Sequence, residues 1–273
     1  MNILVLVSIG FFSLLIGGFI AVVVYRLPLM LQYQWKIETP SLCNYQHTQS
    51  KPFNLLLPAS HCPDCKQTLC FLERLPLFSY LFLKGKCAYC QEKIHFRYPL
   101  IEVLTFICSS IVAYRFHFGI QMLAALMLTW GLIALSGMDF EQCLLPDVLV
   151  LPLLWLGLVL NAFHVFVAPE TAILGACVAY LSLWILAESY RFLTKREGMG
   201  HGDFKCFALL GAWLGCNVLI DILLIASFLG SAVACVLLLS KKNSFVTAVP
   251  FGPYLAIAGW LTLLGENPSS FFI

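Results

Sequence analysis

Long apolar runs alternate with short polar connections along most of the chain. They lie at roughly 3–24, 100–116, 119–138, 148–167, 171–190, 204–216, 218–240 and 252–265, and the sixth and eighth are the shortest. Runs of this length suit helices that cross a hydrocarbon core of about 30 Å. The pattern predicts an all-α polytopic membrane protein with about eight transmembrane helices. The first run lacks the basic start and the small-residue cleavage site of a signal peptide, so we expect a retained helix.

Composition and charge support this class and give it an orientation. Of the 273 residues, 60% are hydrophobic and 11% are charged, which excludes a soluble domain of this length. Fifteen of the sixteen Lys and Arg residues fall in 26–97, in 191–205 or just after the seventh run, and Arg115 is the exception. Cytoplasmic loops of membrane proteins are enriched in positive residues. We therefore expect the N-terminus outside and these three segments in the cytoplasm.

One sizeable hydrophilic segment separates the first two apolar runs. We divide the chain into a first transmembrane helix at 1–25, a cytoplasmic loop at 26–97 and a transmembrane core at 98–273. The front of the loop shows no clean period, so it is expected to be largely irregular.

Four cysteines in this loop have the spacing of a zinc site. The pairs in "HCPDC" and "CAYC" are separated by 21 residues and supply Cys62, Cys65, Cys87 and Cys90. Paired knuckles of this kind hold tetrahedral zinc, and four thiolates leave no open coordination position. Disulfides and a thiol redox pair are the alternatives, but a cytoplasmic loop disfavours the first and no βαβ pattern supports the second. We predict one structural zinc ion.

Acidic residues beside the apolar runs are the candidates for chemistry, because charges near a bilayer are costly. The candidates are Glu102, Asp139, Glu141, Asp147, Glu188, Asp203 and Asp221. The topology places Asp221 at the outer edge, where an interfacial residue is expected, and Glu102 is at least as well explained by a structural role. It places Asp139, Asp147 and Asp203 at the cytoplasmic edge, so acids 64 positions apart can meet.

Asp203 follows three alternating glycines in the stretch "GMGHGD". Gly198, Gly200 and Gly202 permit a positive φ and the close approach of another chain, such as an extended substrate. The alternative is a Gly-rich linker with an aspartate that caps the next helix. A partner at Asp139 favours chemistry, because two adjacent carboxylates share a proton and can activate a water for attack on an amide. The sequence offers no convincing Ser/His/Asp set and no H-E-x-x-H helix.

Motifs spread over the whole chain are shared with a known family. They are the paired C-x2-C knuckles, "RYPLIE", "MDFEQCLLPDVLVLPLLWLGL", "GMGHGDFKCFALLGAWLG" and "PFGPYLAIAG". These residues closely resemble the bacterial type IV prepilin peptidases, intramembrane aspartyl proteases with a G-x-G-D signature that are also N-methyltransferases of pilus and type II secretion systems. The resemblance implies that Asp139 and Asp203 are catalytic. It also implies a set of site-supporting residues, namely Asp147, Gly200, Gly202 and Lys205.

The same resemblance implies the reaction and its location. Prepilins and pseudopilins are expected to be cleaved after the glycine that ends a short basic leader, at the cytoplasmic edge of the bacterial inner membrane. The new N-terminal residue is then expected to be methylated with S-adenosylmethionine. No G-x-G-x-x-G loop follows a strand, so analogy places the cofactor near Gly85 and Lys86. One departure is "GGFIA" at 17–21, where the family commonly has G-S-F-L-N, and it concerns methylation rather than cleavage.

Two other classes of function stay open at the level of sequence. A proton-coupled transporter would use Asp139 and Asp203 as a relay and would leave a leader peptide intact. A zinc-dependent assembly scaffold would bind partners through the knuckles and use the acids only as helix caps. In addition to substrates we expect contact with the lipid bilayer and no nucleic-acid partner, and the oligomeric state stays undetermined.

Overall fold

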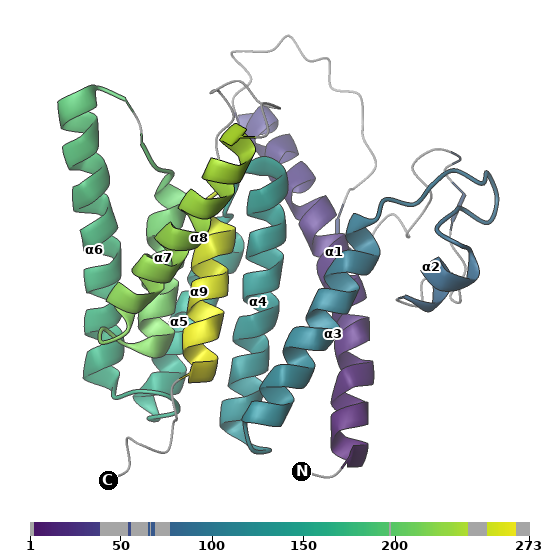
Figure 1. The fold of residues 1–273 in the computed structure, drawn as a ribbon, viewed down its shortest axis with the longest axis horizontal. Coiled ribbons are helices and arrows are strands. Elements are labelled where there is room, and N and C mark those ends of the chain that lie inside the picture. Colours follow the sequence, from purple (N-terminus) through teal and green to yellow (C-terminus); the bar gives the residue numbers. More distant parts are fainter. Residues whose placement is uncertain are drawn as a thin grey trace. The chain divides into compact units, whose positions relative to one another are not determined.

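The structure is a computed structural model that describes residues 3–38, 54–55, 65, 67–68, 77–196, 198–239 and 250–265. The regular elements within these residues are helices, and an isolated β-bridge joins Lys86 to Lys93. Figure 1 shows the helices, which are α1 (Ile3–Glu38), α2 (Phe78–Phe82), α3 (Arg97–Arg115), α4 (Ile120–Gln142), α5 (Asp147–Ala162), α6 (Pro169–Thr194), α7 (His201–Leu214), α8 (Leu219–Leu239) and α9 (Gly252–Gly265). Each predicted apolar run forms a helix, so the all-α polytopic fold is confirmed.

The helices differ in length. Among the described residues, α1, α3, α4, α6 and α8 are long and apolar enough to cross a membrane. In contrast, α5 has 16 residues and α7 and α9 have 14 each. At 1.5 Å per residue α7 is about 21 Å long, which is less than the hydrocarbon thickness of ~30 Å. Three of the predicted membrane spans, α5, α7 and α9, are therefore helices too short to count as membrane spans by length alone.

Helix α1 extends further than the sequence pattern predicts. The pattern predicts an irregular loop from residue 26, but the helix continues without a break to Glu38. Pro28 removes one internal hydrogen bond and does not end the helix. The Leu, Met and Gln residues that follow it have high helix propensity. The expectation of irregular structure is therefore wrong for residues 26–38.

The chain forms two compact units, Met1–Tyr114 and Arg115–Ile273. In the first unit α1 packs closely on α3, since a Cβ at Gly17 would lie 3.0 Å from the Cα of Glu102. Glu102 Oε2 accepts a hydrogen bond from the backbone N–H of Leu77 at 2.8 Å, just before α2. This contact gives Glu102 a structural role within the first unit.

In the second unit α7 is the central helix. It packs against α5, α6 and α9, and nearly all of its residues are buried. Glycines permit this packing: a Cβ at Gly211 on α7 would overlap the carbonyl oxygen of Gly175 on α6, and a Cβ at Gly157 on α5 would overlap the ring of Trp213. The indole N–H of Trp213 donates to the carbonyl oxygen of Leu153 on α5 at 2.8 Å. These contacts fix α7 against two neighbours, both laterally and along its axis.

Asn161 fixes the C-terminal end of α7. It is fully buried at the end of α5. Its Nδ2 donates to the carbonyl oxygens of Ala212 and Trp213 at 2.8 and 3.0 Å, and its Oδ1 accepts from the N–H groups of Phe166 and Val167 at 3.0 and 3.2 Å. The side-chain amide thus uses all of its hydrogen-bonding capacity. One side chain therefore joins α7 to the connection between α5 and α6.

Candidate active site

Asp139 lies in the last turn of α4 and is only 5% exposed. Its Oδ2 accepts a hydrogen bond from the backbone N–H of Gly252, the first residue of α9, at 2.8 Å. The C-terminal end of its own helix disfavours a negative charge, whereas the N-terminal end of α9 favours one. The carboxylate of α4 is therefore held by the start of another helix.

Asp203 lies in the first turn of α7 and is 9% exposed. The N-cap of this helix is Gly200, with φ −74° and ψ 144°, and no side chain caps it. The Asp203 carboxylate instead reaches back to a backbone hydrogen bond with Gly200, as acidic residues at the third helical position do. The alternative that made Asp203 the N-cap is wrong in position, although the side chain does satisfy the start of the helix.

The structure brings these two aspartates together at one end of the second unit. The charge of Asp139 acts directly on the Asp203 carboxylate. Leu145, in the α4–α5 connection, packs on both helix starts: a Cβ at Gly202 would lie 2.8 Å from Leu145 Cβ, and a Cβ at Gly252 would lie 3.3 Å from Leu145 Cδ1. Four segments of the chain thus meet at this point, and the predicted meeting of the distant acids occurs.

Cys143 lies close enough to the aspartate pair for their negative charge to affect its thiol. It is the C-cap of α4, directly after the helix, with a left-handed backbone at φ 50°. Partial burial, and then the charges of Asp139 and Asp203, raise the pKa of the Cys143 thiol. The electrostatic potential beside the end of α4 is therefore negative.

Asp147 and Lys205 form an ion pair that joins α5 to α7. Lys205 Nζ lies 2.7 Å from both carboxylate oxygens of Asp147. Asp147 is in the first turn of α5, where a negative charge is favoured. The Lys205 side chain is 30% exposed and that of Asp147 is 53% exposed, so the pair is worth less than about 1 kcal/mol to stability. The ion pair lies two residues after Asp203 along α7.

Two of the three glycines before Asp203 make room for neighbouring side chains and do not leave the backbone accessible to another chain. None of the three alternating glycines has a positive φ. A Cβ at Gly198 would lie 2.7 Å from the ring of Tyr190, and a Cβ at Gly202 would lie 2.8 Å from Leu145. At Gly200 the nearest atom would be 3.6 Å away, which is an ordinary contact. The positive φ that these glycines permit is therefore not adopted, and of the three only Gly200 leaves space for another chain.

A small cavity lies between α6 and the start of α7. Ala187 on α6 and His201 on α7 both line it, and its volume is about 30 Å³. That volume is close to the share of one water molecule in the liquid. Glu188 and Arg191 also line it and form an ion pair at 3.7 Å. The cavity can therefore hold water.

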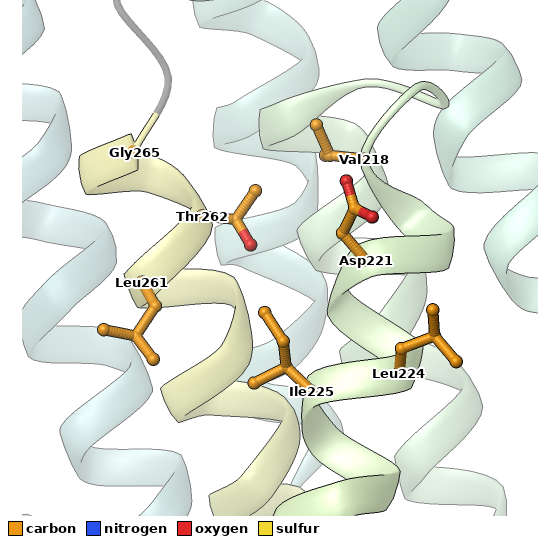
Figure 2. A pocket seen from close by; sticks show the side chains of 7 residues that line it. All are labelled: Val218, Asp221, Leu224, Ile225, Leu261, Thr262 and Gly265. Atoms are coloured by element: carbon orange, nitrogen blue, oxygen red, sulfur yellow. The ribbon is translucent and has the colours of Figure 1, made fainter.

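A larger groove lies at the opposite end of the second unit, between α8 and α9 (Figure 2). Its volume is about 460 Å³, and it combines apolar walls with Asp221 on α8 and Thr262 on α9. Asp221 is exposed in the first turn of α8, which follows the C-terminal end of α7, whereas Asp203 is in the first turn of α7. Asp221 is thus separated from the pair by the length of α7, as the predicted topology requires.

Three of the four predicted zinc ligands lie together in the first unit. The Sγ atoms of Cys65, Cys87 and Cys90 all lie within 4.8 Å of one another. Cys62 lies outside the described residues, and no disulfide joins the cysteines that the structure describes. Tetrahedral Zn–S bonds of about 2.3 Å place the sulfurs roughly 3.8 Å apart. The spacing and the chemistry of this cluster fit zinc.

Gly85 and Lys86, the predicted neighbours of the methyl donor, belong to the turn before Cys87. Gly85 has a φ of +71°, donates its N–H to the carbonyl oxygen of Tyr80 at 2.9 Å and accepts from the N–H of Ile94 at 2.8 Å. Lys86 forms the isolated bridge. The backbone of both residues therefore shapes the second cysteine knuckle.

Two residues that contact the aspartate pair or its helices, Leu145 and Gly252, are not predicted from the sequence. Leu145 is one of several leucines in an apolar stretch, and nothing marks it as a contact of both helix starts. Gly252 stands in "PFGP", where a glycine before a proline suits the first positions of a helix. Because the N–H groups of a helix start lack partners within the helix, this motif is the one signal that points to a bound carboxylate.

Comparisons relate the chain to known proteins. Residues 11–116 match the Bacterial Peptidase A24 N-terminal domain, and residues 126–235 match the Type IV leader peptidase family. The chain is 49% identical to a prepilin leader peptidase/N-methyltransferase of Pseudomonas putida, over 92% of this chain and 88% of that protein. Proteins of the same name from Aeromonas hydrophila and Legionella pneumophila are 47% and 40% identical, over 96% and 97% of this chain and 91% and 93% of theirs. No solved structure matches it.

Proposed function

Because this chain belongs to the prepilin leader peptidase/N-methyltransferase family, we propose that it removes the leader of type IV prepilins and pseudopilins and methylates the new N-terminus. The bond cleaved follows the glycine that ends a short basic leader. The observation that carries the peptidase part is the buried pair of Asp139 and Asp203, whose carboxylates interact where α4 ends and α7 begins.

Asp139 and Asp203 are the catalytic residues of this proposal. Two interacting carboxylates do not both ionise readily, so they share a proton. The ionised member takes a proton from a water, whose oxygen bonds to the scissile carbonyl carbon, while the protonated member gives its proton to the carbonyl oxygen. The aspartate that took the water proton then gives it to the nitrogen as the C–N bond breaks, and the other aspartate takes a proton back from a hydroxyl group of the tetrahedral intermediate. The products are a leader carboxylate and a new N-terminal amine.

Four further residues support the pair in this proposal. Gly200 caps α7 and leaves space beside the pair for the substrate backbone, whereas Gly202 permits Leu145 to pack on the start of α7. The ion pair of Asp147 and Lys205 connects the start of α5 to α7, two residues after Asp203. None of these four needs to contact the reacting atoms.

The proposed location is the bacterial inner membrane, with a periplasmic N-terminus and the aspartates at the cytoplasmic edge. The distribution of Lys and Arg supports this orientation, since it leaves only Arg115 outside. A prepilin carries its basic leader in the cytoplasm and its apolar helix in the bilayer. Its scissile bond therefore lies at the depth of the pair, and the negative charge beside α4 suits a basic leader.

S-adenosylmethionine is the methyl donor in this proposal. When bound it supplies an electrophilic methyl group for the new amine. We propose, by analogy with the family, that it binds in the cytoplasmic loop near Gly85 and Lys86, whose backbone forms the turn before Cys87.

The test of the proposed function is mass spectrometry of a prepilin co-expressed with this chain in a host that lacks its own prepilin peptidase. The expected product has lost its leader and gained one methyl group at the new N-terminus. A prepilin whose glycine before the cleavage site is replaced should stay intact. An intact wild-type leader would overturn the peptidase assignment, and an unmethylated product would overturn only the methyltransferase assignment.

We also propose that Cys62, Cys65, Cys87 and Cys90 hold one structural zinc ion, for which the three clustered thiols provide the support. Zinc bound by four thiolates fixes the two knuckles to each other and has no position for a substrate.

Replacing Cys90 by serine is therefore expected to remove the metal, because a hydroxyl group is a poor substitute for a zinc-bound thiolate. Elemental analysis of purified protein should find about one zinc ion per chain in the wild type and less than about a tenth of that in the variant. Cys177→Ser, at an exposed position on α6, is the matched control and should keep its zinc. Full zinc content in Cys90→Ser, or a wild type without zinc, contradicts the proposal.

A further inference from the structure

Gly252, at the start of α9, has no part in the reaction as described above, yet it contacts Asp139 directly. We propose that Gly252 is a positioning residue for peptide cleavage, because its N–H and the N-terminus of α9 hold the Asp139 carboxylate toward Asp203. This inference rests on the proposed peptidase function. It adds a third helix to an active site that the sequence assigns to two.

The first support is the electrostatic position of Asp139. The backbone N–H of Cys143 donates to the carbonyl oxygen of Asp139 at 2.8 Å, so the residue sits where α4 ends. The negative end of that helix dipole acts against a carboxylate charge. The hydrogen bond from Gly252 to Asp139 Oδ2, also 2.8 Å and buried, brings the positive end of α9 to the same group. The start of α9 therefore offsets the unfavourable end of α4.

The second support is that a side chain at residue 252 would displace the Asp139 carboxylate. Gly252 is not among the glycines with a positive φ, so its backbone conformation is open to any residue. A Cβ there would lie 2.7 Å from Asp139 Oδ2, 3.2 Å from Asp139 Cγ and 3.3 Å from Leu145 Cδ1. Contacts below 3.0 Å require a neighbour to move, and the nearest neighbour is the carboxylate itself. A side chain at position 252 would thus turn Asp139 away from its present orientation.

The third support is that α9 is anchored well enough to act as a fixed support. The indole N–H of Trp260 on α9 donates to Thr129 Oγ1 on α4 at 3.1 Å. Gly259 lies so close to α7 that a Cβ there would overlap the side chain of Leu210. Because α9 contacts both helices that carry the aspartates, its first N–H group has a defined place relative to each.

The test compares kcat and KM of purified Gly252→Ala and Gly265→Ala with the wild type, using a purified prepilin in detergent micelles and only the folded fraction of each enzyme. Gly265→Ala makes the same change in the last residue of α9, where a Cβ would have no atom within 4 Å, so it controls for alanine in this helix. A hydrogen bond to a charged group supports about a tenfold to hundredfold effect. We expect Gly252→Ala to lower kcat by that factor with KM within about threefold, and Gly265→Ala to keep kcat within about threefold.

If alanine at position 252 prevents folding, a second variant tests the role of Gly252, and a binding measurement tests it independently of the rate. Pro253→Gly loosens the first turn of α9 without adding an atom beside Asp139, and it should lower kcat by about threefold or more. A leader peptide whose scissile amide is replaced by a hydroxyethylene group should bind Gly252→Ala more weakly than wild type, while the unmodified peptide binds equally.

The outcomes separate this inference from the function on which it rests. A wild type that leaves prepilin intact overturns the proposed function. A wild type that cleaves, together with a Gly252→Ala enzyme whose kcat stays within about twofold or falls no more than that of Gly265→Ala, overturns the positioning role of Gly252 alone.

Discussion

Replacing either Asp139 or Asp203 by alanine is expected to abolish leader removal, with the rate of prepilin cleavage falling by at least about 100-fold. Each carboxylate has its own task in the proposed reaction, and neither can be replaced by a methyl group. The pair acts as one unit, so the double variant should be no slower than the worse single variant. Time courses of cleavage with purified prepilin, analysed by gel shift and mass spectrometry, measure these rates.

The control for this series is Asp221→Ala, which removes an exposed acid at the other end of the same unit. It should cleave at the wild-type rate, and all variants should accumulate in the membrane to similar levels. Processing at the wild-type rate by either Asp139→Ala or Asp203→Ala would show that the pair is not catalytic. Loss of activity in Asp221→Ala would show that the assay reports folding rather than chemistry.

The second large effect is expected at Gly211, where α7 meets α6. Alanine in place of glycine normally favours a helix by up to about 1 kcal/mol. Here the new Cβ would overlap the backbone carbonyl oxygen of Gly175, and backbone atoms cannot turn aside as a side chain can. Gly211→Ala should therefore lower the free energy of unfolding by about 2–3 kcal/mol, within the usual range for overpacking. Titration with SDS in mixed micelles measures this free energy.

Gly119→Ala makes the same chemical change where a Cβ would have only one atom within 4 Å, at 3.9 Å. Its backbone is extended, with φ 171°, so alanine adopts it without strain. The unfolding free energy of this control should match that of the wild type to within about 0.5 kcal/mol. Equal stability of Gly211→Ala and Gly119→Ala would mean that the close approach of α6 and α7 is not needed.

The helices of the core can be predicted from the sequence because each corresponds to a long run of apolar residues. Each apolar run is a helix, and apart from the end of α1 its bounds lie within about five residues of those predicted, since a bilayer requires runs of apolar residues. The end of α1 does not follow, because Pro28 and the polar residues after it resemble a loop, yet the backbone continues as a helix. Propensity at a single proline is a weak guide when the flanking residues favour helix.

The meeting of Asp139 and Asp203 could be deduced because the number of membrane crossings between them puts both on one side. The contacts that hold them could not. The role of Gly252 depends on a distance between two helices that are 113 positions apart in sequence, and Leu145 looks like any other apolar residue. For the glycines before Asp203 the sequence suggests more than the structure contains. Their pattern suggests an unusual backbone, whereas two of them only make room for Tyr190 and Leu145.

The unequal lengths of α6 and α7 have a consequence for the depth of the chemistry. Ala187 on α6 is level with His201 at the start of α7, because both line one small cavity. Helix α6 continues from there to Thr194, which is about two turns or on the order of 10 Å. The aspartate pair is therefore recessed below the end of its neighbouring helix. In the proposed reaction, hydrolysis therefore takes place inside the span of the protein, below the end of α6.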